Sequence, residues 1–430
     1  MQQSGRTPAQ IPPSAHQIPL SAVSKPALKI VKQLNDAGYE AYLVGGCVRD
    51  LLLQHIPKDF DVATNAYPEE VKAVFNRARL IGRRFRLAHV RMGRDVVEVA
   101  TFRAGFADGP GGEDDDRHVN EDGQIMRDNV YGGIEDDAFR RDFTINALYY
   151  DPTTQNVVDY VDGAVHLRER RLVTIGDPGV RFREDPVRML RALRFSVKLG
   201  FDLDPEVSNA IIRSADSLQN VPPSRMLDEL LKLFHNGYAL DVYHELSALG
   251  LFQHLFPFTY ACEAAGGREL IELALASTDR RVQEGKPVIP AFFFACFLWK
   301  PLLEETEART RNGMPLRAAF ATASFDLLRD QSCHVAIPKR IAAIVREIWQ
   351  LQHRLEKRLP RGINVLLRHQ RFRAAYDFLL LRQEIGEVDE DLADWWTRIQ
   401  VADPAGQQEM IKALAPQSQG SRRRRRRRRR

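Results

Sequence analysis

Two different periods of apolar and polar residues divide the chain. Before about residue 168, short apolar runs such as Leu43–Val44 and the alternating stretch Asp95–Phe102 are separated by Gly, Pro and Asp, which is typical of strands joined by turns. Beyond that point apolar residues recur every three or four positions for most of the chain, which is typical of helices. The pattern predicts an α+β fold, with a small mixed β-sheet and flanking helices followed by an all-α region.

The stretch Leu43–Asp61 carries the first candidate chemistry. Its pattern predicts a strand, a glycine turn, a short helix and a second strand, at Tyr39–Val44, Gly45–Gly46, Val48–Gln54 and around Asp59 and Asp61. Residues i and i+2 of a strand point to the same face, so the two carboxylates can hold the same Mg²⁺ ions. Taken alone, the Asp-x-Asp pair also fits a surface turn.

Two further segments bring charge into predicted secondary structure. Glu98 shares one face of the predicted strand Asp95–Phe102 with Val96 and Ala100, so it is either buried with partners or faces a site. Ile134–Tyr149 is predicted to be helical and contains a polar cluster, made up of Arg140, Arg141, Asp142 and Asn146.

One predicted helix has a strongly cationic side. Asp185 stands where an N-cap belongs and Pro186 occupies the first helical position. Helical spacing gathers basic residues on one face and apolar residues on another; the basic ones are Arg188, Arg191, Arg194 and Lys198, and the apolar ones are Val187, Leu190, Leu193 and Val197. The basic face fits a triphosphate or an RNA backbone, although Arg194 and Lys198 would also fit a role in bracing helices.

Composition shifts along the chain predict five regions. A Gln-, Pro- and Ser-rich start is expected to be disordered, and a run of arginines to form a disordered tail. The predicted regions are a disordered segment (1–25), an α/β head (26–167), a helical neck (168–250), a helical body and tail (251–415) and an Arg-rich tail (416–430).

Composition also excludes several classes of protein. The chain has no run of about 18 apolar residues that would span a bilayer, and its N-terminus lacks a secretory signal, so we expect a cytoplasmic protein without membrane attachment. The four cysteines lie far apart without metal-ligand spacing, so we expect reduced thiols and no structural metal.

The positive charge is concentrated in the last nine residues. The formal net charge is +5, and Arg422–Arg430 contribute +9, so the preceding part carries −4 (5 minus 9). Such a run is attracted to polyanions and releases counterions if the partner is nucleic acid. A solvated tail without a specific partner is the alternative.

Taken together, these segments resemble a known family. The matching runs, in order and at compatible spacings, are GGCVRDLLL, DFDVATNAYPEEV, EVATFR, RRDFTINALYYD, EDPVRMLRALRF and PPSRMLDELL. They are similar to class II nucleotidyltransferases, the group that contains bacterial poly(A) polymerases and tRNA CCA-adding enzymes. The resemblance covers roughly Ala41 to Phe234, and it implies a nucleotidyltransferase head followed by an all-α neck, body and tail.

The resemblance also implies roles for particular residues. Asp59 and Asp61 match the carboxylates that bind two Mg²⁺ ions, and Glu98 is a third carboxylate candidate. Residues that match nucleotide-contacting positions are Gly45, Gly46, Arg49 and Arg141. Asp142 matches an active-site aspartate that serves ribose recognition or supports catalysis, with a purely structural salt bridge as its alternative.

Base selection is implied for the predicted neck. Asp185 and Arg188 match the pair that reads the base edge in CCA-adding relatives, with Arg191 and Arg194 on the adjoining face. Asp185 would also fit a simple N-capping role, which is compatible with base contact.

One segment distinguishes the two branches of the family. Leu80–Val90, LIGRRFRLAHV, is similar to the signature of bacterial poly(A) polymerases, and the basic C-terminal tail resembles the same branch. The implied function is template-independent addition of AMP from ATP to RNA 3′ ends by two-metal phosphoryl transfer, promoting RNA decay, with RNA-decay proteins as further partners. A tRNA CCA-adding enzyme and a catalytically inactive RNA-binding protein are the alternatives.

Overall fold

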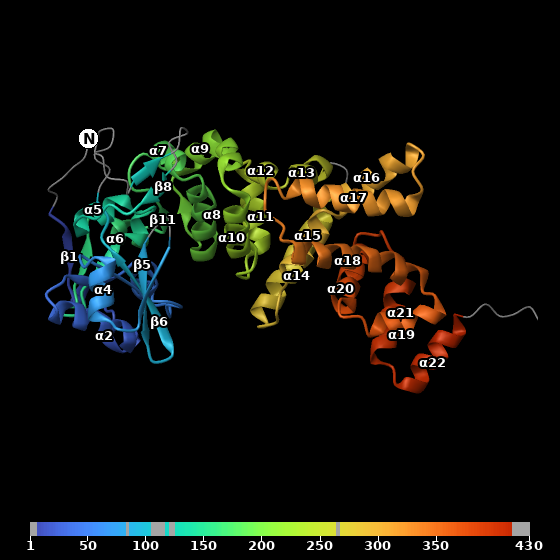
Figure 1. The fold of residues 1–430 in the computed structure, drawn as a ribbon, viewed down its shortest axis with the longest axis horizontal. Coiled ribbons are helices and arrows are strands. Elements are labelled where there is room, and N and C mark those ends of the chain that lie inside the picture. Colours follow the sequence, from blue (N-terminus) through green and yellow to red (C-terminus); the bar gives the residue numbers. More distant parts are fainter. Residues whose placement is uncertain (1–6, 83–85, 105–116, 120–124, 264–266, 415–430) are drawn as a thin grey trace, which may run out of the picture. The chain divides into compact units, whose positions relative to one another are not determined.

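The computed structural model describes residues 7–82, 86–104, 117–119, 125–263 and 267–414. The chain forms two compact units, of which unit 1 comprises Met1–Val221 with Ala248–Leu251, and unit 2 comprises Pro222–Ser247 with Phe252–Arg430 (Figure 1). All the strands of the described residues belong to unit 1, so the predicted α+β fold with a helical second part is confirmed.

An eight-stranded mixed sheet organises unit 1. The strands of the chain are β1 (Ala9–Ile11), β2 (Ala41–Val44), β3 (Asp61–Thr64), β4 (Ala78–Ile81), β5 (Leu87–Met92), β6 (Asp95–Thr101), β7 (Arg117–Val119), β8 (Ile125–Asp128), β9 (Leu148–Tyr150), β10 (Val157–Asp159), β11 (Arg171–Leu172) and β12 (Asp202–Leu203). The sheet order is β1-β10-β9-β2-β3-β6-β5-β4, while β7 pairs with β8 and β11 with β12 outside it. The pair β3 and β6 at the centre is parallel, and the other pairs of the large sheet are antiparallel.

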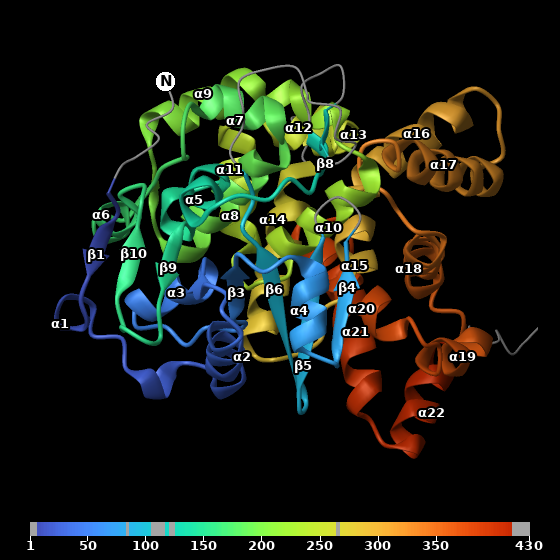
Figure 2. The same ribbon diagram turned by 60° about the vertical axis from the view of Figure 1, so that its left-hand side comes forward.

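Helices pack on both faces of this sheet. Those of unit 1 are α1 (Pro13–His16), α2 (Lys25–Asp36), α3 (Gly46–Leu52), α4 (Pro68–Val74), α5 (Ile134–Arg140), α6 (Gly163–Arg168), α7 (Pro178–Glu184), α8 (Val187–Leu199) and α9 (Pro205–Ser214). Helices α2 and α4 contact each other and the central strands on one face (Figure 2). On the other face, Ala138 of α5 packs with Ala63, Phe102 and Tyr149. Helices therefore pack against both faces of the sheet, α2 and α4 on one face and α5 on the other.

The predicted disorder of residues 1–25 is wrong for residues 7–25, whereas residues 1–6 lie outside the described residues. Strand β1 extends the sheet by pairing with β10, and the His16 ring lies 2.8 Å from the Gln155 carbonyl oxygen. Ile18 and Val23 are buried. These contacts are all tertiary, and the local sequence composition could not reveal them.

The predicted helix Ile134–Tyr149 is wrong beyond Arg140. Arg141 adopts an extended conformation, Thr144–Asn146 forms one 3₁₀ turn and Tyr149 belongs to β9. The polar residues that interrupt the helical pattern turn to partners on other elements, and those contacts outweigh helix propensity.

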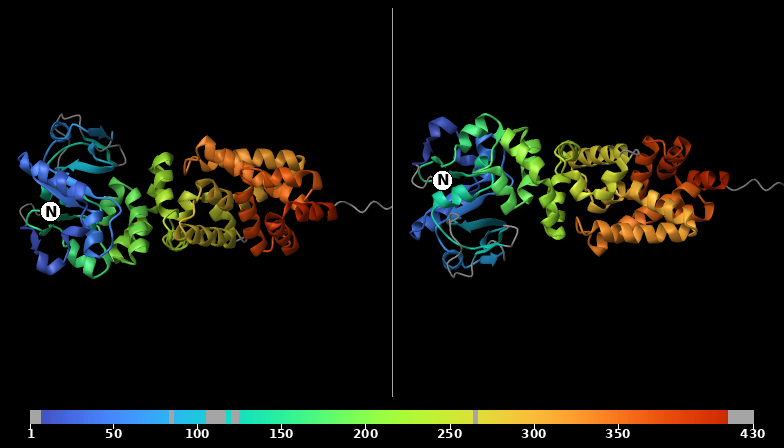
Figure 3. Two further views of the ribbon diagram at one scale, coloured as in Figure 1. Left: turned by 90° about the horizontal axis from the view of Figure 1, so that it is seen from below. Right: turned by 90° about the horizontal axis from the view of Figure 1, so that it is seen from above.

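Unit 2 is helical throughout its described residues (Figure 3). Its helices are α10 (Pro223–Phe234), α11 (Ala239–Ala248), α12 (Phe252–Leu255), α13 (Pro257–Cys262), α14 (Arg268–Gln283), α15 (Pro290–Phe297), α16 (Trp299–Arg311), α17 (Leu316–Gln331), α18 (Lys339–Lys357), α19 (Ile363–Leu367), α20 (Phe372–Glu384), α21 (Glu390–Val401) and α22 (Pro404–Ala413). The aromatic residues Phe293, Phe294, Trp395 and Trp396 are buried, and Phe292 is partly buried.

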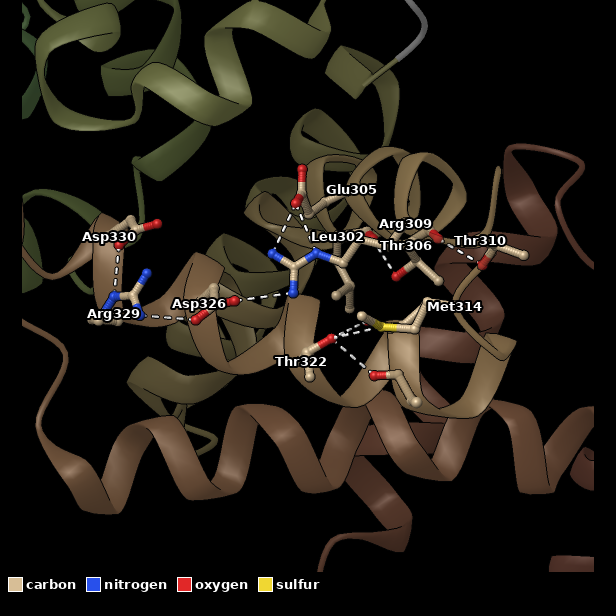
Figure 4. A network of polar contacts seen from close by, with 12 residues as sticks. Leu302, Glu305, Thr306, Arg309, Thr310, Met314, Thr322, Asp326, Arg329 and Asp330 are labelled. Atoms are coloured by element: carbon tan, nitrogen blue, oxygen red, sulfur yellow. Dashed lines mark hydrogen bonds and ion pairs between the residues drawn. The ribbon is translucent and has the colours of Figure 1, made fainter. Parts of the chain in front are cut away.

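Polar contacts reinforce the hairpin of α16 and α17. Arg309 of α16 donates to Glu305 one turn earlier and to Asp326 of α17, at 2.8 and 2.9 Å (Figure 4). Arg329 forms a further ion pair with Asp326, at 2.9 Å. This partly exposed network therefore joins the two helices of the hairpin.

Two sequence expectations concern the environment of the chain. All four cysteines are free thiols, three of them buried and Cys333 exposed. None of the described helices combines the length and the apolar character needed to cross a membrane.

Candidate active site

Strands β3 and β6 bring two carboxylates together. Their parallel register pairs Asp61 with Glu98, so both side chains leave the same face of the sheet. Asp59 precedes β3 by two residues, and all three carboxylates are exposed to solvent. The predicted Asp59, Asp61 and Glu98 therefore gather at one place, on the solvent-exposed surface of unit 1.

Mutual repulsion makes this cluster electrostatically strained. Partial burial against the sheet and then the negative charges of Glu98 and Asp59 raise the pKa of Asp61 to about 6, although Arg141 opposes the shift. Like charges held close together favour protonation or the binding of cations. The cluster is suited to a positively charged ligand.

Glu98 has a basic neighbour on the adjacent strand. The His89 ring nitrogen Nε2 lies 3.1 Å from Glu98 Oε1, across the antiparallel pair β5 and β6. His89 belongs to the Leu80–Val90 segment, of which residues 83–85 lie outside the described residues. The sequence pattern gave no signal for this contact, because it depends on strand register.

The glycine turn before α3 is tightly enclosed. Gly45 has φ = 76° and ψ = −128°, and a Cβ added there would lie 3.3 Å from Arg141 Nη1 and 3.6 Å from the Asn146 carbonyl oxygen. Both the positive φ and the close approach require glycine. Gly46 then begins α3, and its backbone lies beside the Arg49 guanidinium.

Arg141 is held in a fixed position between the turn and the core. It donates to Asp137 Oδ2 at 3.1 and 3.0 Å and to the Tyr149 hydroxyl at 3.1 Å. Burial would lower the pKa of Arg141, but Tyr149 and Asp137 outweigh it and raise the pKa. Its charge is therefore permanent, and it also acts on Asp61.

Arg49 is buried on the other side of the same turn. Its Nη1 donates to Asn146 Oδ1 at 2.7 Å, while Nε and Nη2 donate to Asp50 Oδ1 at 2.8 and 2.6 Å. The guanidinium also lies 5.1 Å from the centre of the Phe195 ring of α8. These contacts fix Arg49 with only 3% of the residue exposed.

Asp142 points away from the carboxylate cluster. Its Oδ2 accepts from Arg191 Nε at 2.7 Å, and its Oδ1 accepts from Asn146 Nδ2 at 3.2 Å and from the Phe143 amide at 2.9 Å. Burial would raise the pKa of Asp142, but Arg191 and Asn146 outweigh it and lower the pKa to about 2. Adjacent residues of an extended segment point in opposite directions, so Arg141 faces Asp61 and Asp142 faces α8.

The residues matched to base reading lie at the junction of α7 and α8. Asp185 is buried, and its Oδ1 accepts from the Val187 amide at 3.3 Å. The N-cap of α8 is Pro186, one residue later than the position predicted for it. Arg188 Nη1 donates to Glu184 Oε2 at 2.7 Å and to the Arg181 carbonyl oxygen at 3.0 Å. The side chains of both predicted residues are therefore restrained at this junction, Asp185 by a backbone amide and Arg188 by Glu184 and a carbonyl oxygen.

Arg181 joins this junction to the head segment. Its Nη2 donates to the carbonyl oxygens of Arg140 and Arg141, and its Nη1 donates to Glu184 at 2.9 Å. Burial and the nearby Arg188 lower the pKa of Arg181 to about 10. Arg181 and Glu184 were not among the predicted site residues, and their only signal in the sequence was their position next to Asp185.

Three cations surround one aromatic ring on α8. The guanidinium of Arg194 lies 4.6 Å and that of Arg191 5.5 Å from the Phe195 ring centre, in addition to Arg49. The cationic face predicted for this helix therefore adjoins the phosphate-binding candidate Arg49. Asn146, which joins Arg49 to Asp142, was visible in the sequence only as one member of a polar cluster.

The carboxylates do not form a closed metal site by themselves. Within the described ranges, no three His, Cys, Asp or Glu side chains are already arranged to hold a metal ion. Asp59 and Asp61 supply two hard oxygen donors, and this is the usual protein share of a Mg²⁺ site completed by water and substrate phosphates.

Family models match three parts of the chain. The model of the "Poly A polymerase head domain" matches residues 41–173, and that of the "Polymerase A arginine-rich C-terminus" matches residues 312–430. Between them, residues 200–262 match a model described as "Probable RNA and SrmB-binding site of polymerase A". The head match contains the carboxylates and both glycines.

Curated relatives extend the likeness to nearly the whole chain. Poly(A) polymerase I of Escherichia coli O157:H7 is 45% identical over 421 residues, which cover 96% of this chain and 90% of the relative. The enzyme of the same name from Haemophilus influenzae is 45% identical over 90% of this chain and 87% of its own length. A CCA-adding enzyme of Geobacillus thermodenitrificans is 38% identical, but over only 53% of this chain and 54% of its own.

Solved structures share the architecture. The CCA-adding enzyme of Bacillus stearothermophilus in complex with CTP has a TM-score of 0.56 and 26% identity, covering 91% of this chain and 82% of that structure. The Thermotoga maritima CCA-adding enzyme complexed with tRNA has a TM-score of 0.59 at 18% identity, covering 88% of this chain and 83% of that structure. The second of these likenesses concerns the fold alone.

Proposed function

The chain belongs to the family of bacterial poly(A) polymerases and is a polynucleotide adenylyltransferase, and we propose that AMP transfer takes place at the site around Asp59 and Asp61. The observation that carries this assignment is the gathering of Asp59, Asp61 and Glu98 at the exposed face of β3 and β6, beside Arg141 and the Gly45 turn. The carboxylates, which can bind cations, then lie next to Arg141, which can bind phosphates, and phosphoryl transfer requires both.

The donor set fits magnesium. Asp59 and Asp61 offer hard oxygen ligands. Burial and then the negative charges of Glu98 and Asp59 raise the pKa of Asp61, and a bound cation would relieve this repulsion. Two Mg²⁺ ions held by these aspartates would supply the positive charge that lowers the pKa of the primer 3′-hydroxyl and balances the triphosphate. Glu98 completes the negative patch, with His89 holding its carboxylate.

The chain's own cations would hold the triphosphate. The Gly45–Gly46 turn has no Cβ to obstruct a phosphate, and Arg141 and Arg49 flank it from two sides. In the reaction the primer 3′-oxygen forms a bond to the α-phosphorus of ATP, the bond from that phosphorus to the β-phosphate oxygen breaks, and pyrophosphate leaves. Positioning of these groups by the rigid arginines is the main contribution of the protein.

Ribose and base recognition is assigned to the neighbouring elements. Asp142 supports the site through Asn146 and Arg191, because its carboxylate is already occupied by both. Asp185 and Arg188, at the junction of α7 and α8, are proposed to read the adenine edge, and Arg191 and Arg194 to add positive charge beside it. Glu184 restrains Arg188 in a single orientation, which would favour one base over others.

The proposal extends to partners and location. Primer RNA 3′ ends and ATP are the substrates. The related CCA-adding enzymes, solved in complex with CTP and with tRNA, bind ligands of the same two chemical classes. A role in RNA decay with decay proteins as partners, and a location in the cytoplasm, where buried free thiols such as Cys47 remain reduced, belong to the same proposal.

Nucleotide selectivity is the direct test of the reaction. The protein is given an unstructured RNA primer with each nucleoside triphosphate alone and Mg²⁺, and product length is resolved on a gel. Long tails with ATP alone are expected. Incorporation of CTP on tRNA, limited to a few residues, would instead identify a CCA-adding enzyme, and no Mg²⁺-dependent incorporation at all would identify an inactive RNA-binding protein.

Removal of one carboxylate tests the site. Asp59→Asn is expected to abolish AMP addition, by at least about a thousandfold, while primer binding by fluorescence anisotropy stays within about twofold. Asp36→Asn, an exposed aspartate of α2 paired with Lys32, is the matched control and should retain full activity. Near-normal elongation by Asp59→Asn would remove it from the metal site.

A further inference from the structure

Unit 2 contains a partly enclosed cavity of about 250 Å³ that lies among α10, α14, α15 and the start of α20. This is close to the roughly 300 Å³ at the lower end of ligand pockets, so it suits a single base with part of its sugar. The cavity lies wholly within unit 2, and none of its residues belongs to the candidate active site.

The inner wall of the cavity is aromatic and apolar. Phe293 is buried and makes an edge-to-face contact with the His235 ring, with 6.0 Å between ring centres. Phe292 and Leu275 add to this wall, and burial lowers the pKa of His235, so its ring is neutral at pH 7. Flat aromatic rings at the edge of a cavity are the surfaces on which nucleobases stack.

The mouth of the cavity is cationic. Of the charged side chains that line it, three are arginines and one is an aspartate: Arg281, Arg371, Arg373 and Asp377. Asp377 orients two of the arginines, since its carboxylate lies 2.9 Å from Arg373 Nε and 3.7 Å from Arg281 Nη1. An aromatic interior behind a cationic mouth matches a base with its phosphate outside.

The basic surface continues beyond the mouth. A neighbouring hollow shares Gln370 with the cavity and adds Arg368 and His369 to the same side of the chain. Glu347 of α18 pairs with Arg371 at 3.3 Å and keeps it at this boundary. The basic residues can thus contact the phosphates of an RNA strand on both sides of the cavity. A site for a free mononucleotide would not need this extension.

We propose that this cavity accepts one unstacked base of single-stranded RNA, with the arginines at its mouth holding the adjoining phosphates. The inference rests on the proposed function, because it assumes an RNA substrate, and it adds a second contact to the strand apart from the carboxylate site. Stacking tolerates any base, and the strand that this enzyme produces supplies adenine.

A bulky side chain placed in the cavity tests the proposal. Ser277→Trp fills the space from α14, while Ala276→Trp places the same side chain at the exposed neighbouring position, which does not line the cavity. Affinity for a labelled single-stranded oligoadenylate is measured by anisotropy with the full-length protein. Ser277→Trp is expected to weaken binding about tenfold, equal to about 1.4 kcal/mol, and Ala276→Trp to stay within about twofold.

A charge-reversal pair covers the case in which the filled variant does not fold. Arg373→Glu at the mouth should weaken oligoadenylate binding, whereas Arg280→Glu, exposed on α14 outside the cavity, should have a clearly smaller effect. An oligoadenylate carrying one photoreactive azidoadenine should also crosslink to the α14–α15 region, and unlabelled oligoadenylate should compete for this crosslink.

Three results would overturn the inference. These are equal oligoadenylate affinities within both variant pairs, a crosslink that free AMP displaces as well as RNA does, and competition by a polyanion without bases that is as effective as RNA. Wild-type AMP transfer is measured in the same preparation. Its absence would count against the proposed function, whereas its presence with unaffected variants would count against the cavity alone.

Discussion

Arg191 and Asp142, 49 residues apart in the chain, form an ion pair in which Nε and Nη2 of the partly exposed arginine lie 2.7 and 2.6 Å from one oxygen of the buried carboxylate. The pair fastens α8 to the extended segment that follows α5, and hence to Arg141, which faces Asp61. Asp142 was predicted to serve ribose recognition or to support catalysis, with a structural salt bridge as the alternative. Its contacts with Asn146 and Arg191 connect the residues proposed to bind phosphate with those proposed to read the base.

The ion pair predicts a particular acid sensitivity. The pKa of Asp142 is about 2 in the folded protein, below the ordinary value of about 3.9, so the ionised carboxylate stabilises the folded state. Because the folded pKa is depressed, this stabilisation is fully present above about pH 4 and is lost as the pH falls toward 2. Asp142→Asn should therefore lower the free energy of unfolding at pH 7. Below pH 3 the free energies of unfolding of the variant and the wild type should become similar, as measured by urea denaturation across this pH range.

A remote aspartate provides the comparison for Asp142. Asp36→Asn removes an exposed pair with Lys32, which contributes little, so its stability should follow that of wild type at every pH. If Asp142→Asn and Asp36→Asn have the same profile, the ion pair does not determine acid stability.

Asn146 is expected to act as a positioning residue. Asn146→Ala removes the acceptor of Arg49 Nη1 and a donor to Asp142, which leaves polar groups unsatisfied at a cost of about 1–3 kcal/mol each at most. We expect kcat/KM for ATP to fall about tenfold or more through misplacement of Arg49. Asn65→Ala, which removes a single exposed acceptor of the Glu40 amide, should leave kcat/KM near wild type.

Asn146→Asp separates positioning from simple loss of packing. The aspartate keeps the shape and the acceptor for Arg49 but places a second negative charge beside Asp142, so the pH profile of kcat/KM should shift along with its magnitude. An unchanged profile in both variants would show that Asn146 serves only packing.

Asp61 is predicted to oppose folding while it serves the reaction. Its pKa is raised to about 6 in the folded state, above its value in the unfolded chain, so ionisation destabilises the protein as the pH rises from about 4 through 6. Asp61→Asn should raise the melting temperature at pH 7.5 in the presence of a chelator and abolish AMP transfer. Added Mg²⁺ should stabilise wild type and not Asp61→Asn, and a lower melting temperature for the variant would contradict this assignment.

The fold could be predicted where the sequence pattern is local. The strand–turn–helix–strand order around Gly45 and the amphipathic α8 follow from period and turn chemistry, and both are present. Strand β1 and the end of α5 at Arg140 could not be predicted, because one depends on pairing with β10 and the other on side chains that leave the helix for distant partners.

The sequence predicted which residues belong to the candidate site better than it predicted how they are arranged in space. The Asp-x-Asp spacing placed Asp59 and Asp61 on one face, but the approach of Glu98 depends on the parallel register of β3 and β6. Likewise, the Arg140–Arg141–Asp142 run predicted a cluster of charged residues but not the directions in which their side chains point. Only the extended backbone at Arg141 shows that this arginine and Asp142 serve opposite sides.

The arginine run is predicted to contribute sequence-independent affinity for RNA. Arg422–Arg430 lie outside the described residues, and the argument depends on charge alone. Their deletion should weaken primer binding and reduce the slope of log affinity against log salt, by at most about 6 for nine neutralised phosphates of a single strand. A nine-lysine tail should keep most of the slope and a Gly-Ser tail of equal length should not; an unchanged slope after deletion would exclude the tail from RNA contact.

Gly45 provides a test of the turn at which the phosphate groups are expected to bind. Gly45→Ala imposes a positive φ on alanine and brings its Cβ to 3.3 Å from Arg141 Nη1, whereas Gly38→Ala has a similar φ of 90° with no atom within 4 Å. Both variants should lose about 1–3 kcal/mol of stability by chemical denaturation, because both carry the backbone strain. Only Gly45→Ala should also lose kcat/KM for ATP, by about tenfold or more, because it alone displaces Arg141. If the two variants lose activity equally, strain accounts for the whole effect and the contact between Gly45 and Arg141 has no part in binding ATP.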